Sequence, residues 1–154
     1  MTTRHIVPDA LQGVYDRWHF APAVVRGGLI FCSGVIGTSV DGAPPGGAAL
    51  AGAQARTDQG DGLTALQAVR DPEAQFATAF AALRMILRAA GADLSDVIEL
   101  TSYHVDMSRH MATFVAVRDR YLSAPWPAWT AVGVAELVVP GGLVELRAVA
   151  AARA

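Results

Sequence analysis

Glu145 is the carboxylate best placed for chemistry, because it lies within the apolar segment 143–150. In an extended strand, alternate side chains point to opposite faces. One face of this segment is then wholly apolar, and the other carries Leu143, Glu145, Arg147 and Val149. The mixed face is too apolar for water and too polar for a core, as at a subunit interface or a cleft. A carboxylate there can have its pKa raised into the range for acid or base catalysis; the alternative is a solvated strand residue paired with Arg147.

Ser33 is a second polar candidate, at the end of a strand predicted for residues 29–32. Its hydroxyl is suited either to orienting a ligand or to ending the strand. The sequence supplies no histidine and carboxylate in a signature spacing that would make this serine a nucleophile. The adjacent Cys32 is the single cysteine, and we expect it on the opposite face as a small buried side chain rather than a reactive thiolate.

The four histidines do not form a metal-ligand pattern. His104 falls in the middle of a predicted strand, on the same face as Leu100 and Ser102. A hydrogen-bonded core histidine is more common at such a position than a catalytic one. We therefore expect no metal site and no cofactor.

The elements that must position these residues begin with a β-hairpin. Residues 24–25 and 29–32 form its strands, and the glycine-containing segment 26–28 forms its turn. Residues 38–70 are rich in Gly, Ala, Pro, Asp and Gln and predict a partly mobile loop insertion, in which 63–69 could form a short helix. Asp71 as cap and Pro72 at the first helical position then start a helix that Gly91 ends.

The second half of the chain predicts a strand, a helix and a closing hairpin. The strand covers residues 97–105, and Ser108 is expected to cap a helix that Pro125 and Pro127 terminate. Strands at 130–137 and 143–150 follow, joined by a turn at 140–142. The order is hairpin, helix, strand, helix, hairpin, which indicates an α+β fold.

Composition narrows the class of protein. The chain has 154 residues, which predicts one domain over 1–154, and 53% of them are hydrophobic, an excess that favours subunit contacts. Fourteen acidic and 12 basic residues are mixed along the chain for a net charge of -2, so a nucleic-acid partner is not expected. No signal peptide and no apolar stretch of membrane-spanning length is seen, which predicts a soluble cytoplasmic protein without a membrane partner.

Five segments in order resemble the signatures of the Rid family, the YjgF-like reactive-intermediate deaminases. They are residues 20–24, 29–34, 91–97, 127–128 and 143–150. The resemblance implies a chorismate-mutase-like α+β fold, with a mixed β-sheet and two helices on one face. It also implies a homotrimer with the sheets packed inward, and ligand clefts between neighbouring subunits. The family's familiar reaction is the hydrolysis of reactive imines and enamines to a ketoacid and ammonia.

The resemblance also implies a site, with Glu145 as the catalytic residue that activates water. The implied ligand-binding residues are Ser33, Gly34, Phe20, Val115, Trp129 and Thr130. Trp129 stands where active members have an arginine that grips the substrate carboxylate. Phe20 replaces a tyrosine and Val115 an asparagine, so three polar contacts have become apolar. Trp129 is also suited to filling a core or an interface.

Three functions follow from this pattern. The first is a divergent hydrolase or deaminase-like enzyme for a small, relatively apolar or aromatic imine or enamine, in a setting such as specialised metabolism. The second is a non-catalytic small-molecule-binding or regulatory trimer that has lost the chemistry. The third is ordinary imine deamination with an arginine from elsewhere, for which Arg17, Arg26 and Arg56 are candidates. For the first, activity on small aliphatic imines is expected to be weak, because tryptophan cannot compensate a buried carboxylate.

Overall fold

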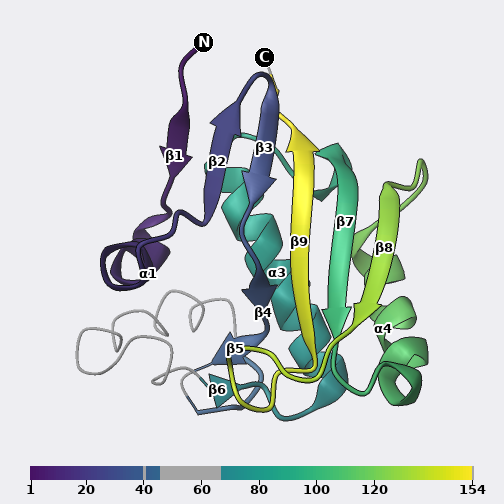
Figure 1. Ribbon diagram of the computed structural model, residues 1–154. Coiled ribbons are helices and arrows are strands. Elements are labelled where there is room, and N and C mark those ends of the chain that lie inside the picture. The colour runs from purple at the N-terminus through teal and green to yellow at the C-terminus, as the bar shows by residue number, and fades with distance from the viewer. Residues whose placement is uncertain (40, 46–66, 154) are drawn as a thin grey trace.

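The computed structural model describes residues 1–39, 41–45 and 67–153 (Figure 1). The longer helices are α1 (Gln12–Trp18), α3 (Pro72–Ala89) and α4 (Met107–Tyr121), with 3-10 turns at η1 (Asp9–Leu11) and η4 (Leu94–Asp96). The strands are β1 (Arg4–Ile6), β2 (Ala23–Arg26), β3 (Leu29–Cys32), β4 (Val35–Ile36), β5 (Thr38–Ser39), β6 (Gln67–Ala68), β7 (Val97–His104), β8 (Ala128–Gly133) and β9 (Val144–Ala151). No helix in these ranges is long and apolar enough to cross a membrane.

A mixed sheet organises the described residues, as the family resemblance implied. Its strand order is β1-β2-β3-β9-β7-β8, with β4 also paired to β9, and β7 and β8 are its parallel pair. Figure 1 shows α3 and α4 behind one face of this sheet, and no helix of the described chain across the other face. The short strands β5 and β6 pair separately.

The apolar faces of α3, α4 and β9 form the core between helices and sheet. Phe76, Phe80 and Phe114 are fully buried, and the Phe114 ring contacts those of Phe76 and Phe80 at centroid distances of 5.7 and 5.9 Å. On β9, the four residues predicted for the helix-facing side are all buried: Val144, Leu146, Ala148 and Ala150. The alternation predicted from the sequence is therefore confirmed.

The start and the end of α3 are as predicted. The Asp71 side chain accepts a hydrogen bond from the Ala74 backbone N–H at 2.8 Å, and Pro72 occupies the first helical position. Gly91 follows with a φ of +86°, a conformation that favours glycine. At both ends of α3, the local sequence is therefore sufficient to predict where the helix begins and ends.

The predicted closing hairpin is wrong. β8 pairs in parallel with β7, and β9 lies between β3 and β7. The physical reason is that a helix between two strands returns the chain for parallel pairing, while the apolar face of β9 is best buried at the centre of the sheet. β8 also covers Ala128–Gly133 rather than residues 130–137.

Smaller boundary predictions also need correction. α4 begins at Met107 after Asp106, whose φ is +51°, so Ser108 is a helical residue and not the cap. The helix ends at Tyr121, before either proline. Within the predicted insertion, Gln67–Ala68 is strand β6 rather than helix; residues 46–66, including Arg56, lie outside the described residues.

Gln75 joins three segments through a buried amide. Its Nε2 donates to the carbonyl oxygens of Val69 at 2.9 Å and Gly141 at 3.1 Å, and its Oε1 accepts from the Leu143 backbone N–H. The side chain is fully buried. Since an unpaired buried polar group is costly, this amide fixes the loop before β9 onto α3.

Gln75→Met should lower the free energy of unfolding by about 3 kcal/mol, because the similar-sized side chain leaves three backbone groups unpaired. Urea denaturation measures the change. Thr78→Val on the same helix is the control, since it removes a hydroxyl that donates only to Ala74 O, and it should cost less than about 1 kcal/mol. Equal losses in the two variants would contradict the role of the amide.

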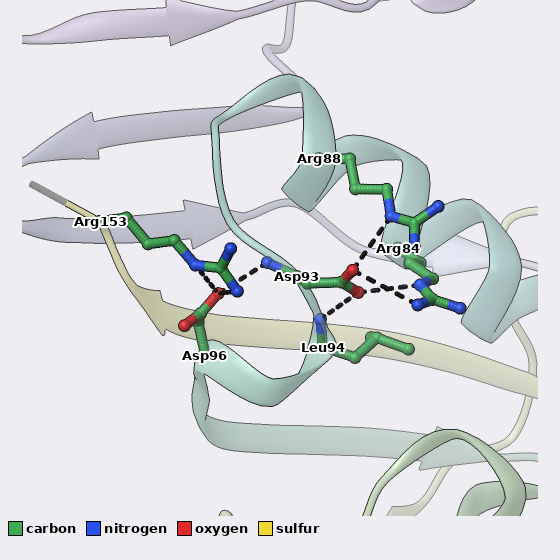
Figure 2. A network of polar contacts seen from close by, with 6 residues as sticks. All are labelled: Arg84, Arg88, Asp93, Leu94, Asp96 and Arg153. Carbon is green, nitrogen blue, oxygen red and sulfur yellow. Dashed lines mark hydrogen bonds and ion pairs between the residues drawn. The ribbon is translucent and has the colours of Figure 1, made fainter.

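A network of charges ties the end of α3 to η4 and to the end of β9 (Figure 2). Asp93 accepts hydrogen bonds from Arg84 Nε at 2.8 Å and Arg88 Nε at 3.0 Å, while its backbone N–H donates to Asp96 at 2.7 Å. Arg153, after β9, donates to the same Asp96 carboxylate at 2.9 Å. The hydrogen bond from Arg84, above all, lowers the pKa of Asp93 to about 2.

Asp93→Asn should reduce stability at neutral pH by about 1 kcal/mol, a modest value because both arginines are about half exposed. The folded-state pKa of Asp93 is depressed, so its contribution is complete above its unfolded-state pKa and is lost as pH falls toward 2. The stability difference between wild type and variant should therefore shrink between pH 5 and 2, as measured by denaturation at several pH values. A difference that stays constant over this range would exclude the linkage.

Candidate functional site

Ser33 and Gly34 lie in a β-bulge between β3 and β4. Phe31 pairs with Val149 of β9, but Val35 pairs with Leu146, so three residues on one strand face two on the other. A bulge bends its strand and redirects side chains, and bulges are frequent beside active sites. The extra residue brings Gly34 against β9 while Val35 stays in the core.

The Glu145 carboxylate lies directly over Gly34. A Cβ atom at position 34 would overlap with the carboxylate carbon and Oε1 of Glu145, so only glycine leaves room for this side chain. Glu145 is half-buried, and burial raises its pKa above the ordinary value. No hydrogen bond or ion pair to its side chain is found within the described parts of the chain.

A cavity of about 700 Å³ opens beside this carboxylate. Its wall is mostly apolar and includes Leu11, Val14, Trp18, Phe20, Phe31 and Val138. Ser33 and Gly34 also line it, and Glu145 and Arg147 are the charged side chains among its described lining residues. Such a cavity suits a small ligand with an apolar body and few polar groups.

The Ser33 hydroxyl donates its proton to the carbonyl oxygen of Ala21 at 2.7 Å, and the Ser33 backbone N–H donates to Pro22 O at 2.9 Å. Since a hydroxyl has one proton, the Oγ atom offers only lone pairs to the cavity. Ser33 is therefore suited to accept a hydrogen bond from a ligand N–H, and its own proton is directed at a backbone carbonyl oxygen rather than at a base of the described chain.

The structure separates the predicted site residues into two groups. Phe20, Ser33, Gly34 and Glu145 share the cavity, whereas Trp129, Thr130 and Val115 do not line it. Thr130 is exposed on the uncovered face of the sheet, beside Thr101, and Val115 is half-buried on α4.

Trp129 lies on the helix-facing side of β8. Its Nε1 donates to Ser102 Oγ at 2.8 Å, its ring stacks on Phe114, and the Arg118 guanidinium lies 4.4 Å from the ring centroid. These contacts hold its ring against its own chain, although Trp129 remains 38% exposed. Any role toward a ligand at Glu145 then requires a second subunit.

Two other sequence predictions are confirmed by the packing. His104 is buried and hydrogen-bonded to Ser102 Oγ at 2.7 Å, and burial lowers the pKa of its imidazole. Cys32 is buried, and burial raises the pKa of its thiol to about 12. Over the residues described, no three His, Cys, Asp or Glu side chains could together hold a metal ion.

Sequence reasoning missed part of the cavity. The sequence predicts Arg147 only as an ion-pair partner of Glu145, although its position on the same strand face also indicates the cavity. Leu11, Val14 and Trp18 gave no signal, because η1 and α1 reach the cavity only through tertiary packing. Arg17 and Arg26, the proposed substitute arginines, do not line it.

Comparisons with known proteins agree with this architecture. The family model described as Endoribonuclease L-PSP matches residues 14–152. The RutC family protein YjgH of Escherichia coli (strain K12) is 29% identical over 130 residues, which cover 84% of this chain and 81% of that protein. The solved structure of protein YJGH has a TM-score of 0.75 at 26% identity, covering 100% of this chain and 99% of that chain. Rv2704 of Mycobacterium tuberculosis, a member of the YjgF/YER057c/UK114 family, has the same fold, with a TM-score of 0.70 at 23% identity and coverage of 97% and 99%.

Gly34→Ala should displace the Glu145 carboxylate, because the added methyl group needs the space that the carboxylate occupies. The displaced group gains water, so its pKa should fall toward the ordinary value of 4.5. Carboxyl carbon NMR of Glu145 over a pH titration measures this. Gly133→Ala, in β8, is the matched control because its nearest neighbouring atom is 3.6 Å away, and it should leave the titration unchanged. An identical Glu145 pKa in wild type and Gly34→Ala would refute the contact.

Proposed function

The chain belongs to the YjgF/RutC family, whose family model is described as Endoribonuclease L-PSP, and we propose that it is a deaminase-like hydrolase of this family. Its substrate is a small, relatively apolar or aromatic imine or enamine. The reaction takes place at the cavity formed by Ser33, Gly34 and Glu145.

The observation that carries this proposal is that the Glu145 carboxylate, in an otherwise largely apolar cavity, has no hydrogen-bond or ion-pair partner among the described residues. A structural carboxylate at such a place would be expected to have a hydrogen-bond or ion-pair partner, because an uncompensated charge is costly to bury. A raised pKa brings the group closer to neutral pH, where it can both accept and return a proton.

In the proposed reaction, a water oxygen attacks the carbon of the C=N bond while Glu145 takes a proton from that water. The substrate reacts as its iminium form, C=NH2⁺, so the electron pair of the C=N bond moves to nitrogen and a neutral carbinolamine forms. Protonated Glu145 then returns its proton to the amine nitrogen, the C–N bond breaks, and ammonia leaves as the carbinolamine oxygen forms the C=O bond. The Glu145 carboxylate takes the hydroxyl proton and passes it to the departing ammonia, which leaves as ammonium. One water is consumed for each ammonia released.

Ser33 orients the substrate in this scheme. Because its hydroxyl proton is donated to Ala21 O, Oγ accepts a hydrogen bond from the N–H of an imine or iminium group. This contact holds the nitrogen at one end of the reacting bond. The carbon is then presented to water beside Glu145.

We further propose that the working form is a homotrimer with the sheets packed inward and the cavity completed at a cleft between subunits. The uncovered face of the sheet supports this, since it exposes the apolar side chains of Phe31 and Val132, 39% and 38% accessible. Thr130 lies on the same face. A neighbouring subunit would bring Thr130, Trp129 and Val115 toward the Glu145 cavity.

RNA cleavage, to which the description of the family model refers, finds little support in this cavity. Binding of a phosphate backbone uses several cationic side chains. Arg147 is the one cationic side chain among the described lining residues, and the net charge of the chain is -2. A small neutral or singly charged metabolite fits better.

Glu145→Gln should lower kcat/KM for imine hydrolysis by at least about a hundredfold, the usual contribution of a general base. In the wild type, kcat/KM should rise with pH through a pKa above 4.5, and this limb should vanish in the variant. The folded-state pKa is raised, so ionisation of Glu145 costs stability as pH increases, and Glu145→Gln should be at least as stable at neutral pH. Imines released by an amino acid oxidase, with semicarbazide as the competing trap, provide the assay.

Glu136→Gln, an exposed carboxylate outside the cavity, is the control and should keep wild-type rates. In the same assay, the imines of leucine and phenylalanine should react faster than that of alanine, whose methyl group leaves most of the apolar cavity unfilled. Unchanged turnover in Glu145→Gln would rule out the proposed chemistry. Ligand binding without turnover in the wild type would instead favour the non-catalytic trimer.

A further inference from the structure

We propose that Arg147 binds an anionic group of the ligand in the cavity beside Glu145. This inference rests on the proposed function of the same cavity. It assigns anion recognition to β9 itself rather than to the position of Trp129.

The placement of Arg147 supports this role. Arg147 and Glu145 are two residues apart on β9 and project from the same face. Their Cα atoms are therefore about 7 Å apart along the strand. A small molecule held by Arg147 through one end has its neighbouring atoms within reach of the Glu145 carboxylate.

The Arg147 guanidinium is available for a ligand. Its one ion pair in the described structure is with Glu99, at a long distance of 3.9 Å, and both side chains are about half exposed. Such an exposed pair contributes little stability, so a ligand carboxylate can replace Glu99 at small cost. A guanidinium offers five N–H donors and can bind a carboxylate through two of them at once.

The positive charge of Arg147 also affects the electrostatic potential at the β-bulge between β3 and β4. It lowers the pKa of the Cys32 thiol, although burial has the larger, opposite effect. Cys32 directly precedes Ser33, so the positive potential of Arg147 extends to the residues that hold the ligand nitrogen.

Other arginines are less suitable. Arg26 donates to Thr3 Oγ1 at 3.2 Å, in the outer part of the sheet, and Arg118 covers Trp129. Neither lines the cavity. Arg147 and Glu145 thus form a cation and a base on one strand, surrounded by apolar wall.

Binding of 4-methyl-2-oxopentanoate and of its methyl ester, measured by isothermal titration calorimetry, tests this without requiring turnover. Arg147→Gln should weaken binding of the acid roughly tenfold, a value set by the half-exposed guanidinium, and leave the ester unchanged. Arg147→Lys should lie between wild type and Arg147→Gln, because it keeps the charge without the bidentate geometry. Glu99→Gln should bind the acid at least as tightly as wild type, since the competing carboxylate is gone.

Arg109→Gln, which removes an exposed arginine of α4 outside the cavity, is the control and should bind both compounds as wild type does. Circular dichroism verifies the fold of each variant. Three outcomes would overturn the proposal. Wild type and Arg147→Gln could bind the acid equally well, or the variant could lose affinity for acid and ester in parallel. The third outcome is that wild type does not bind the acid at millimolar concentration. A selective loss for the acid in a protein that hydrolyses no imine would retain the anion site and reject only the proposed reaction.

Discussion

Burial of one apolar face of β9 at the centre of the sheet is the constraint on which the site depends. Val144, Leu146, Ala148 and Ala150 are almost inaccessible, and each larger aliphatic side chain contributes about 1.5 to 3 kcal/mol by leaving water. Because strand residues alternate, this burial forces Glu145 and Arg147 onto the other face. A shift of one residue in the pairing register of β9 would exchange its two faces. Packing of the core therefore fixes the side of the sheet on which Glu145, the candidate acid and base, and the cation Arg147 lie.

Polar contacts then hold the walls around that strand. The buried amide of Gln75 ties the loop before β9 to α3, next to Val138 and Val139, which line the cavity. Gly37 packs so closely against the Gln75 backbone that a Cβ atom there would overlap with its carbonyl oxygen. The contacts of Gln75 therefore position both β4 and the start of β9. At the other end of β9, the Asp93 network holds the chain in place, because Arg153, which follows the strand, donates a hydrogen bond to Asp96.

In the described structure, buried side-chain polar atoms of the scaffold have hydrogen-bond partners with the exception of His104 Nδ1, whereas the Glu145 carboxylate of the candidate site has none. Gln75, Ser102 and Asp93 have partners that match their hydrogen-bonding groups, as buried or partly buried polar atoms should. Glu145 has no such partner among the described residues, and its burial raises the free energy of the charged form. Trp129, at the position where the family resemblance implied a substrate-binding arginine, is instead tied to Ser102 and Arg118. The charged groups at the cavity thus come from β9, which is held by the core.

The sequence alone determined the features that depend on local chemistry and alternation. It predicted the α3 cap at Asp71, the hairpin of β2 and β3, the two faces of β9 and the α+β class. It also predicted Glu145, Ser33 and Trp129 as candidates for the site. Only the tertiary structure decided that β9 lies between β3 and β7 rather than beside β8, because strand order depends on long-range burial that no local signal encodes. It also decided the bulge that places Gly34 under Glu145, the contribution of α1 to the cavity wall, and the position of Arg147 in that wall. These depend on pairing register and packing between segments more than a hundred residues apart.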